Sequence, residues 1–157
     1  DGTPFYHGAK EGVVDTSSSI QIGMREGLYG AEDKSNSARL GYESLTADVM
    51  HNMELKTVVD RICERTQGRK VFLTFDIDFL DPAFAPGTGT PVPGGFSTWE
   101  ALELIRGLKE LDIVGYDLVE VAPSFDAGGI TSIAAAGIIQ EFLSQIAWRK
   151  KFRKMPD

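Results

Sequence analysis

Cysteine and histidine are scarce in this chain. Cys63 is the only cysteine among 157 residues, so an intrachain disulfide is impossible, and a reducing cytoplasm is the compartment that fits best. The two histidines, His7 and His51, have no recognisable partner pattern, and we expect each at the surface or at a helix end. No Ser–His or Cys–His signature is visible, which argues against covalent catalysis.

Basic residues and long apolar runs are also lacking. The 16 Lys and Arg residues are outnumbered by 23 Asp and Glu residues, and the net charge is -7. This balance argues against a broad nucleic-acid-binding surface, whereas an acidic field weakly favours a small cationic substrate. Uninterrupted apolar stretches are too short for a signal peptide or a membrane span. We therefore expect no membrane partner and a cytoplasmic protein.

Strand-like and helix-like segments alternate along the sequence. We predict helices over residues 3–12, 52–66, 97–110 and 131–150, and strands over residues 20–24, 70–75 and 112–122. Residues 27–42 are rich in glycine and polar residues, and we predict a loop there. The alternation predicts an α/β fold with a parallel sheet. Three strands are few for such a sheet, so we expect the C-terminal part of a larger unit that lacks its N-terminal strands.

Several of these segments carry specific local signals. Ser97 and Glu100 have the spacing of a capping box at the start of a helix. The apolar run of residues 70–75 is typical of a parallel strand buried on both faces. The helix over residues 52–66 has an apolar stripe formed by Leu55, Val58, Val59, Ile62 and Cys63. In the last helix, the predicted core-facing residues are Ile138, Ile139, Phe142, Leu143 and Ile146.

Three aspartates, Asp76, Asp78 and Asp81, follow the apolar run KVFLTF. Ligands of open α/β sheets bind beyond the carboxyl ends of the strands, and alternate residues of an extended chain point the same way. Asp76 and Asp78 are therefore predicted to lie together. Two close carboxylates repel unless a cation intervenes, and oxygen ligands suit Mg²⁺ or Mn²⁺. The alternative is that these aspartates only accept hydrogen bonds from backbone donors in a turn.

The loop that follows is unusually rich in proline and glycine. Four of the seven prolines and four glycines fall within residues 82–95. Because proline fixes φ and glycine permits positive φ, such a loop has one specified path, as binding loops often have.

Two other kinds of enzyme that use a D-x-D motif fit this sequence poorly. An aspartyl-phosphate phosphohydrolase requires D-x-D-x-T, whereas Phe79 and Leu80 follow here, and a nucleotide-sugar transferase requires a nucleotide pocket that has no signature in the sequence.

The strand predicted over residues 112–122 contains two further candidates, Glu120 and Asp117. Glu120, near its end, is placed to face the same crevice as the aspartates, where a carboxylate suits a guanidinium or ammonium group. A salt bridge or a cap at the strand end is the alternative. Asp117 lies in mid-strand and is predicted to be a hydrogen-bonded packing residue.

The string FDIDFLDPAFAPGTGTPVPGG strongly resembles the third signature of the ureohydrolases, the agmatinase and arginase family. The segments DGTPFYHGAKEGVVD and RGLKELDIVGYDLVEVAPSFD are also similar to agmatinase-type members, so the resemblance covers nearly the whole chain. It implies a three-layer α/β/α sandwich and a binuclear Mn²⁺ site that activates water for attack on a guanidinium carbon, releasing urea. By position, Asp76 and Asp78 match metal ligands, Glu120 matches the carboxylate that holds the guanidinium, and Thr90 matches a threonine lining that pocket.

The same resemblance shows which parts are missing. Gly-Gly-Asp-His and Asp-Ala-His-x-Asp motifs, which carry the family's other metal ligands, do not occur in these 157 residues, and Asp1 stands where the family usually has a histidine that serves in proton transfer. We predict that residues 1–157 are the C-terminal part of a single ureohydrolase-like domain. The complete unit would hydrolyse a linear, agmatine-like guanidino compound, as a homo-oligomer, whereas this chain alone would be inactive. The alternative is a truncated or degenerate homologue that serves in binding or assembly.

Overall fold

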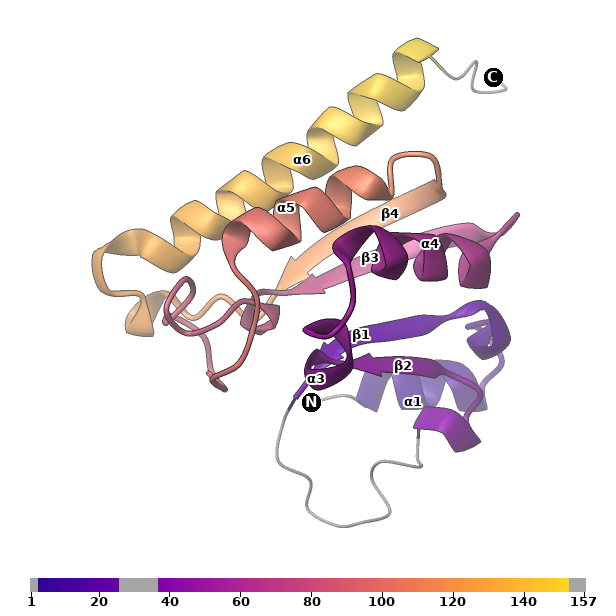
Figure 1. Ribbon diagram of the computed structural model, residues 1–157, viewed down its shortest axis with the longest axis horizontal. Helices are drawn as coiled ribbons and strands as arrows, with labels where there is room; N and C mark the ends of the chain where they lie inside the picture. Colours follow the sequence, from indigo (N-terminus) through magenta and orange to yellow (C-terminus); the bar gives the residue numbers. More distant parts are fainter. Residues whose placement is uncertain (1–2, 26–36, 153–157) are drawn as a thin grey trace. The chain divides into compact units, whose positions relative to one another are not determined.

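The computed structural model describes residues 3–25 and 37–152 and divides the chain into two compact units, Asp1–Arg69 and Lys70–Asp157 (Figure 1). Each unit has its own strands and helices. Most of the loop predicted over residues 27–42 lies outside the described residues, and residues 37–39 within it are helical. That residues 1–157 belong to a single domain stays a prediction.

The first unit contains a two-stranded parallel sheet. Its elements are α1 (Thr3–Lys10), the 3₁₀ turn η1 (Thr16–Ser18), β1 (Ile20–Met24), β2 (Glu43–Thr46), α3 (Ala47–Met50) and α4 (Leu55–Thr66). Strands β1 and β2 pair with Ile20 opposite Glu43. The first predicted helix and strand are confirmed. The prediction of three strands is wrong, because β2 is a fourth. With four residues and one large apolar side chain, Leu45, it is too short to give a periodic signal.

Helix α4 confirms the predicted apolar stripe. Val58 and Ile62 are buried, as the spacing of the stripe requires. The helix begins three residues later than predicted, because Glu54 has extended backbone at the cap position, with φ -67° and ψ 139°. Gly68 follows the helix at φ 72°, a left-handed conformation that stops helices and that glycine adopts without steric cost.

The second unit contains another two-stranded parallel sheet and two long helices. Its strands and α-helices are β3 (Lys70–Asp76), α5 (Thr98–Gly107), β4 (Asp112–Val119) and α6 (Ile130–Phe152), and its 3₁₀ turns are η2 (Ile77–Phe79), η3 (Pro123–Phe125) and η4 (Ala127–Gly129). Strands β3 and β4 pair from Lys70 opposite Asp112 to Asp76 opposite Val119. Figure 1 shows α5 and α6 side by side along β4. Parallel strands connected through helices confirm the α/β class.

Helix α5 begins at the predicted capping box. The Ser97 hydroxyl accepts a hydrogen bond from the Glu100 N–H at 3.2 Å, and the Glu100 carboxylate accepts one from the Ser97 N–H at 2.8 Å. These two bonds satisfy two backbone donors that the first turn leaves without helical partners. The helix ends at Gly107, three residues earlier than predicted, because Leu108 departs from helical geometry.

Two predictions of burial in this unit are wrong. Strand β3 is not buried on both faces, since the Phe72 side chain is 57% exposed. In α6, Ile138 and Phe142 are buried as predicted, but Ile139 and Leu143 are 44% and 55% exposed. The described sheet has only two strands, and so small a sheet cannot cover all the apolar surface of a strand and a long helix.

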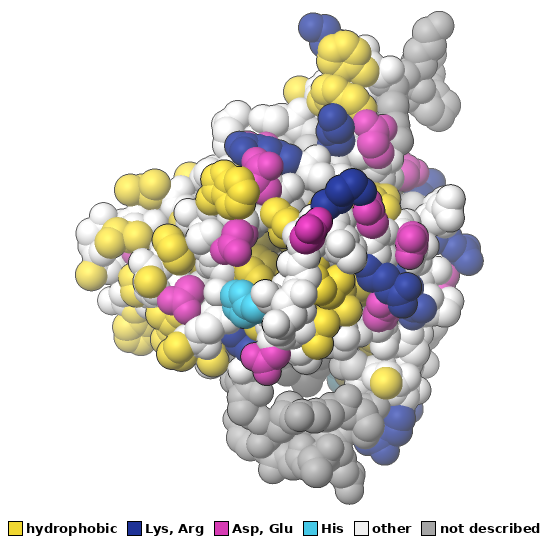
Figure 2. Space-filling view, in the orientation of Figure 1, with side chains coloured by type: hydrophobic (Ala, Val, Ile, Leu, Met, Phe, Trp, Pro, Cys, Tyr) yellow, Lys and Arg dark blue, Asp and Glu magenta, His cyan; other side chains and the backbone are white. Residues whose placement is uncertain are grey.

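Large apolar side chains are also exposed near the loops that follow β3 and β4. They include Phe84, Phe125 and Ile130. Figure 2 shows hydrophobic side chains gathered at one side of the face in view, whereas acidic and basic side chains are interspersed on the rest of that face. Contiguous apolar surface, unlike single exposed residues, marks a contact area. The described residues therefore leave this unit incompletely covered.

Candidate active site

Asp76 is the last residue of β3, and the turn η2 follows it directly. The Asp76 carboxylate accepts a hydrogen bond from the backbone N–H of Asp78 at 3.1 Å, and buried Ile77 and Phe79 anchor the turn. The extended path predicted from Asp76 to Asp78 is wrong, because the aspartate side chain captures the N–H two residues on and turns the backbone. Both residues nevertheless lie at the carboxyl end of β3.

Asp81 organises the loop that follows. Its carboxylate accepts hydrogen bonds from the N–H groups of Ala83 at 2.9 Å, Gly94 at 2.8 Å and Gly95 at 3.1 Å. The backbones approach so closely that a Cβ on Gly95 would lie 2.5 Å from the Asp81 nitrogen. The sequence left open that all three aspartates only accept hydrogen bonds from backbone donors in a turn. Asp81 does this, and Asp76 does it in part.

Glu120 directly follows β4, whose last residue, Val119, pairs with Asp76. Its φ of 66° is left-handed, the one positive φ outside glycine among the described residues. A left-handed backbone at a residue other than glycine costs on the order of 1–3 kcal/mol of conformational free energy. The Glu120 carbonyl accepts a hydrogen bond from the hydroxyl of buried Thr88 at 2.9 Å. This bond holds the backbone of the strained residue in place.

Further hydrogen bonds join the proline- and glycine-rich loop to the segments after β4. The Ala122 N–H donates to the Gly87 carbonyl at 2.9 Å, and the Gly87 N–H donates to the Thr131 hydroxyl at 2.8 Å. Thr131 is fully buried. A Cβ on Gly87 would lie 2.6 Å from the Asp126 Cβ, so this contact requires glycine. Sequence reasoning missed Thr88 and Thr131, because a single threonine carries no local signal.

The structure brings the four predicted site residues together. The Thr90 hydroxyl donates a hydrogen bond to the Asp78 carboxylate at 3.3 Å. The Glu120 Oε2 lies 3.8 Å from where a Cβ on Gly89 would be, so its carboxylate lies against the same loop, and its charge acts on Asp76. Asp76, Asp78, Thr90 and Glu120 therefore line one end of the β3–β4 sheet.

Negative charge is crowded in this site. Burial raises the pKa of Asp76 to about 7, and the charges of Asp78 and Glu120 act in the same direction, although the Asp78 N–H opposes them. A cation near these carboxylates would relieve the repulsion, and oxygen ligands fit a hard divalent ion such as Mg²⁺ or Mn²⁺. Among the described residues, however, no group of three or more His, Cys, Asp or Glu residues is placed to hold a metal. The described residues therefore contain no complete set of metal ligands.

Three other polar predictions concern Asp117 and the histidines. Both histidines are exposed, His7 in α1 and His51 directly after α3, which confirms their predicted surface positions. The prediction of a hydrogen-bonded Asp117 fails for one oxygen, because its Oδ1 is buried and has no hydrogen-bond partner within residues 3–25 and 37–152.

Known proteins match both the sequence and the fold. A sequence profile described as the arginase family matches residues 1–144. The chain belongs to the arginase family. Among curated members of this family, the agmatinase of Neisseria meningitidis serogroup C is 49% identical over 142 residues, which cover 90% of this chain and 44% of that protein. This arginase-family chain thus spans less than half the length of the curated relatives that it matches.

Two crystal structures show the same relation in three dimensions. A hypothetical agmatinase from Burkholderia thailandensis superposes with a TM-score of 0.85 at 42% identity, over 94% of this chain and 44% of that one. The proclavaminate amidino hydrolase of Streptomyces clavuligerus superposes with a TM-score of 0.83 at 42% identity, over 90% of this chain and 46% of that one. The predicted α/β fold with a missing part is confirmed.

Proposed function

We propose that this arginase-family chain is part of a metal-dependent ureohydrolase that converts a linear, agmatine-like guanidino compound to an amine and urea. The main support is the convergence of Asp76, Asp78, Thr90 and Glu120 on one end of the β3–β4 sheet. Matches to agmatinases at 49% identity support the choice of substrate class. The proposal includes Mn²⁺ as cofactor, a homo-oligomeric complete unit, a role in polyamine metabolism and a cytoplasmic location.

Each of the four residues has a role that its chemistry supports. Asp76 and Asp78 hold the cation, which when bound supplies Lewis-acid activation and lowers the pKa of water. Glu120 binds the positively charged guanidinium through charge-assisted hydrogen bonds, and the hydrogen bond from Thr88 to its carbonyl fixes its backbone at the end of β4. Thr90 lines the guanidinium pocket and orients the Asp78 carboxylate through its hydroxyl.

The same residues support an incomplete site in the isolated chain. A cation held by only two protein carboxylates keeps most of its water ligands and binds weakly. The part of the relatives that this chain does not cover, more than half of their length, is the source that we propose for the other ligands. We therefore propose that the 157-residue chain binds Mn²⁺ weakly and does not turn over substrate.

Calorimetric titration with Mn²⁺ and a urea assay with agmatine test this proposal on the isolated chain. We expect weak binding to the wild-type chain, binding at least about tenfold weaker in D76N and D78N, and unchanged binding in D48N, which alters an exposed aspartate in α3. We expect no urea from any of them. Equal Mn²⁺ binding by wild type, D76N and D78N would remove the metal role of these residues.

A non-catalytic binding or assembly module is the second candidate function. It is favoured by the absence of a metal-holding group of three or more residues among those described. The two candidates differ in their response to the missing part of the protein. A catalytic half gains urea release when that part is supplied, whereas an assembly module forms the complex and remains inactive.

A further inference from the structure

The first turn of α6 is tied to Asp126, in the segment that follows β4. The Asp126 carboxylate accepts hydrogen bonds from the N–H groups of Thr131 at 2.9 Å and Ser132 at 2.8 Å, and from the Ser132 hydroxyl at 2.6 Å. The two N–H groups lie in the first turn of the helix, where they have no helical partners. These bonds, that from the Ser132 hydroxyl above all, lower the pKa of the Asp126 carboxyl, so the carboxylate is charged at neutral pH. Asp126 therefore fixes the backbone of Thr131.

Thr131 in turn holds Gly87, in the loop that follows β3. The Thr131 side chain is fully buried, and its hydroxyl accepts a hydrogen bond from the N–H of buried Gly87 at 2.8 Å. A Cβ on Gly87 would lie 2.9 Å from that hydroxyl oxygen, so the loop backbone rests directly on the start of the helix. A buried N–H that loses its acceptor carries the full cost of its desolvation. The position of Gly87 therefore depends on the Thr131 hydroxyl.

Gly87 and Thr88 run alongside the end of β4 and the residues that follow it. The Gly87 carbonyl accepts a hydrogen bond from the Ala122 N–H at 2.9 Å, and Thr88 forms an antiparallel bridge with Val121. The Thr88 hydroxyl donates to the Glu120 carbonyl at 2.9 Å. A displacement of Gly87 would therefore be transmitted to the backbone of Glu120.

The same loop also reaches the predicted metal ligands. Thr90, three residues after Gly87, donates a hydrogen bond to the Asp78 carboxylate at 3.3 Å. The loop thus joins the proposed cation-binding side of the site, Asp78, to the proposed guanidinium-binding side, Glu120. Attack on the carbon of a guanidinium held by Glu120 requires these two sides at a set spacing, and a misplacement of about 1 Å can cost about a hundredfold in rate. The position of Gly87 therefore bears on the reaction as well as on stability.

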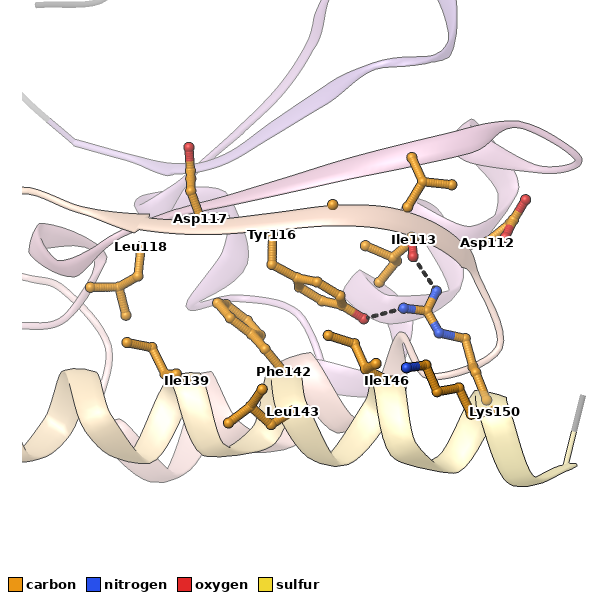
Figure 3. A pocket seen from close by; sticks show the side chains of 13 residues that line it. Asp112, Ile113, Tyr116, Asp117, Leu118, Ile139, Phe142, Leu143, Ile146 and Lys150 are labelled. Atoms are coloured by element: carbon orange, nitrogen blue, oxygen red, sulfur yellow. Dashed lines mark hydrogen bonds between the residues drawn. The ribbon is translucent and has the colours of Figure 1, made fainter. Parts of the chain in front are cut away.

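Helix α6 is a rigid support for this contact, because its far end is fixed to β4. The Arg149 guanidinium donates hydrogen bonds to the Ile113 carbonyl and, at 2.9 Å, to the Tyr116 hydroxyl (Figure 3). The rings of Tyr116 and Phe142 stack with their centroids 4.7 Å apart. A helix held in this way does not shift freely when the Thr131 hydroxyl is removed, so the loop is the part that would move.

These contacts also distinguish α6 from a membrane span. The segment Ala127–Phe152 is long and apolar enough to cross a membrane, with a mean hydropathy of 1.3. Its Arg149 is buried and bonded to β4, and its Glu141 forms an ion pair with Arg106 of α5 at 2.6 Å. A membrane span would have to take these charged groups into lipid, which is costly. We therefore treat α6 as a helix packed within the protein.

We propose that Thr131 is a positioning residue of the candidate active site. Its hydroxyl holds the Gly87 N–H and thereby fixes the spacing between Asp78 and Glu120. The positioning rests on the contacts of the structure, and its consequence for the reaction rests on the proposed function. A threonine with a purely structural role would stabilise the fold as a whole and leave the reactivity of the site unchanged.

Two substitutions of Thr131 separate the effect of the hydroxyl from that of the side-chain volume. T131V removes the acceptor for the Gly87 N–H and keeps a similar volume, whereas T131S keeps the hydroxyl. D126N weakens the cap that holds Thr131 from a half-buried position, and it provides the test if circular dichroism shows that T131V does not fold. S144A is the matched control, because it removes an exposed hydroxyl of the same helix that donates to the Gln140 carbonyl at 2.8 Å.

Amide hydrogen exchange in the isolated chain, followed by NMR, tests the positioning without any need for turnover. The readout is the Ala122 N–H, which donates to the Gly87 carbonyl. We expect T131V to accelerate its exchange at least about tenfold relative to the amides of the paired strands β3 and β4. D126N should act in the same direction by about threefold, and T131S and S144A should change it less than about twofold. Equal acceleration at Ala122 and throughout the strands, or none at Ala122, would overturn the proposal.

Urea release tests the consequence for the reaction. The chain is co-expressed with the portion of the N. meningitidis agmatinase that lies outside its match to this chain, and the complex is assayed with Mn²⁺ and agmatine. We expect T131V to lower kcat/KM about a hundredfold, mainly through kcat, and T131S and S144A to stay within about threefold of wild type. A T131V complex with the kcat of wild type would overturn the proposal. A wild-type complex that releases no urea would refute the proposed function instead, and the exchange of the Ala122 N–H would still decide whether Thr131 positions the loop.

Discussion

Replacing Asp76 with asparagine should stabilise the metal-free chain in a pH-dependent way. Burial, with the nearby charges of Asp78 and Glu120, raises the pKa of the Asp76 carboxyl to about 7, so the fold disfavours the charged form. Stability is therefore lost as pH rises from the pKa of the unfolded chain, about 3.9, to that of the folded chain. Asparagine keeps an oxygen for the Asp78 N–H but carries no charge, so D76N lacks this penalty.

The magnitude follows from the shift in pKa. At about 1.36 kcal/mol per pKa unit, a rise from 3.8 to about 7 sets an upper bound near 4 kcal/mol. Because solvent reaches this partly exposed site, it reduces both the cost of burial and the repulsion, and we expect about 1–2 kcal/mol. The assay is urea unfolding in EDTA, followed by tryptophan fluorescence, at several pH values between about 5.5 and 8.

The stability gained by D76N over wild type should grow towards neutral pH and level off above about pH 7. D48N is the matched control, because it removes one charge from an exposed aspartate in α3 and should change stability little at any pH. If D76N is no more stable than the wild-type chain at pH 8, burial and the neighbouring carboxylates do not disfavour the charged form of Asp76 as the structure indicates.

Three further predictions concern backbone geometry and use the same unfolding assay. Both E120G and E120A remove the carboxylate, but only alanine is strained at a φ of 66°. E120G should therefore be more stable than E120A by about 1 kcal/mol. The reverse order would show that the backbone at this position is not strained. G95A should destabilise by about 1–3 kcal/mol, because its Cβ would lie 2.5 Å from the Asp81 nitrogen. In contrast, G137A meets no atom within 4 Å in α6 and should stabilise by about 0.5–1 kcal/mol; a loss of stability there would contradict the helical assignment.

The elements that were predictable from the sequence are those whose signals are local. The capping box of Ser97 and Glu100 lies within one helical turn, and the stripe containing Val58 and Ile62 lies within one helix. The exposure of Phe72 and Leu143 was not predictable, because it depends on which other strands and helices are present. An apolar run indicates that burial is favourable, but it cannot show that the covering element belongs to the same 157 residues.

The candidate site, too, could be predicted from the sequence only in part. The resemblance placed Asp76, Asp78, Thr90 and Glu120 by position, and the structure brings them to one sheet end. The left-handed backbone of Glu120 and the hydrogen bond from Thr88 that holds it had no sequence signal. They join two loops 32 residues apart, and such contacts depend on how β3 and β4 pair rather than on either loop alone.

Urea release by the reconstituted protein tests the central claim most directly, that these residues are one part of a guanidine-hydrolysing site. The 157-residue chain, as wild type, D78N or the control D48N, is co-expressed with the portion of the N. meningitidis agmatinase that lies outside its match to this chain. The complex is then assayed with Mn²⁺ and agmatine. We predict urea from the complexes with wild type and D48N, none from the complex with D78N, and none when either polypeptide is omitted. Urea from the chain alone, or a formed wild-type complex that releases none, would contradict the account.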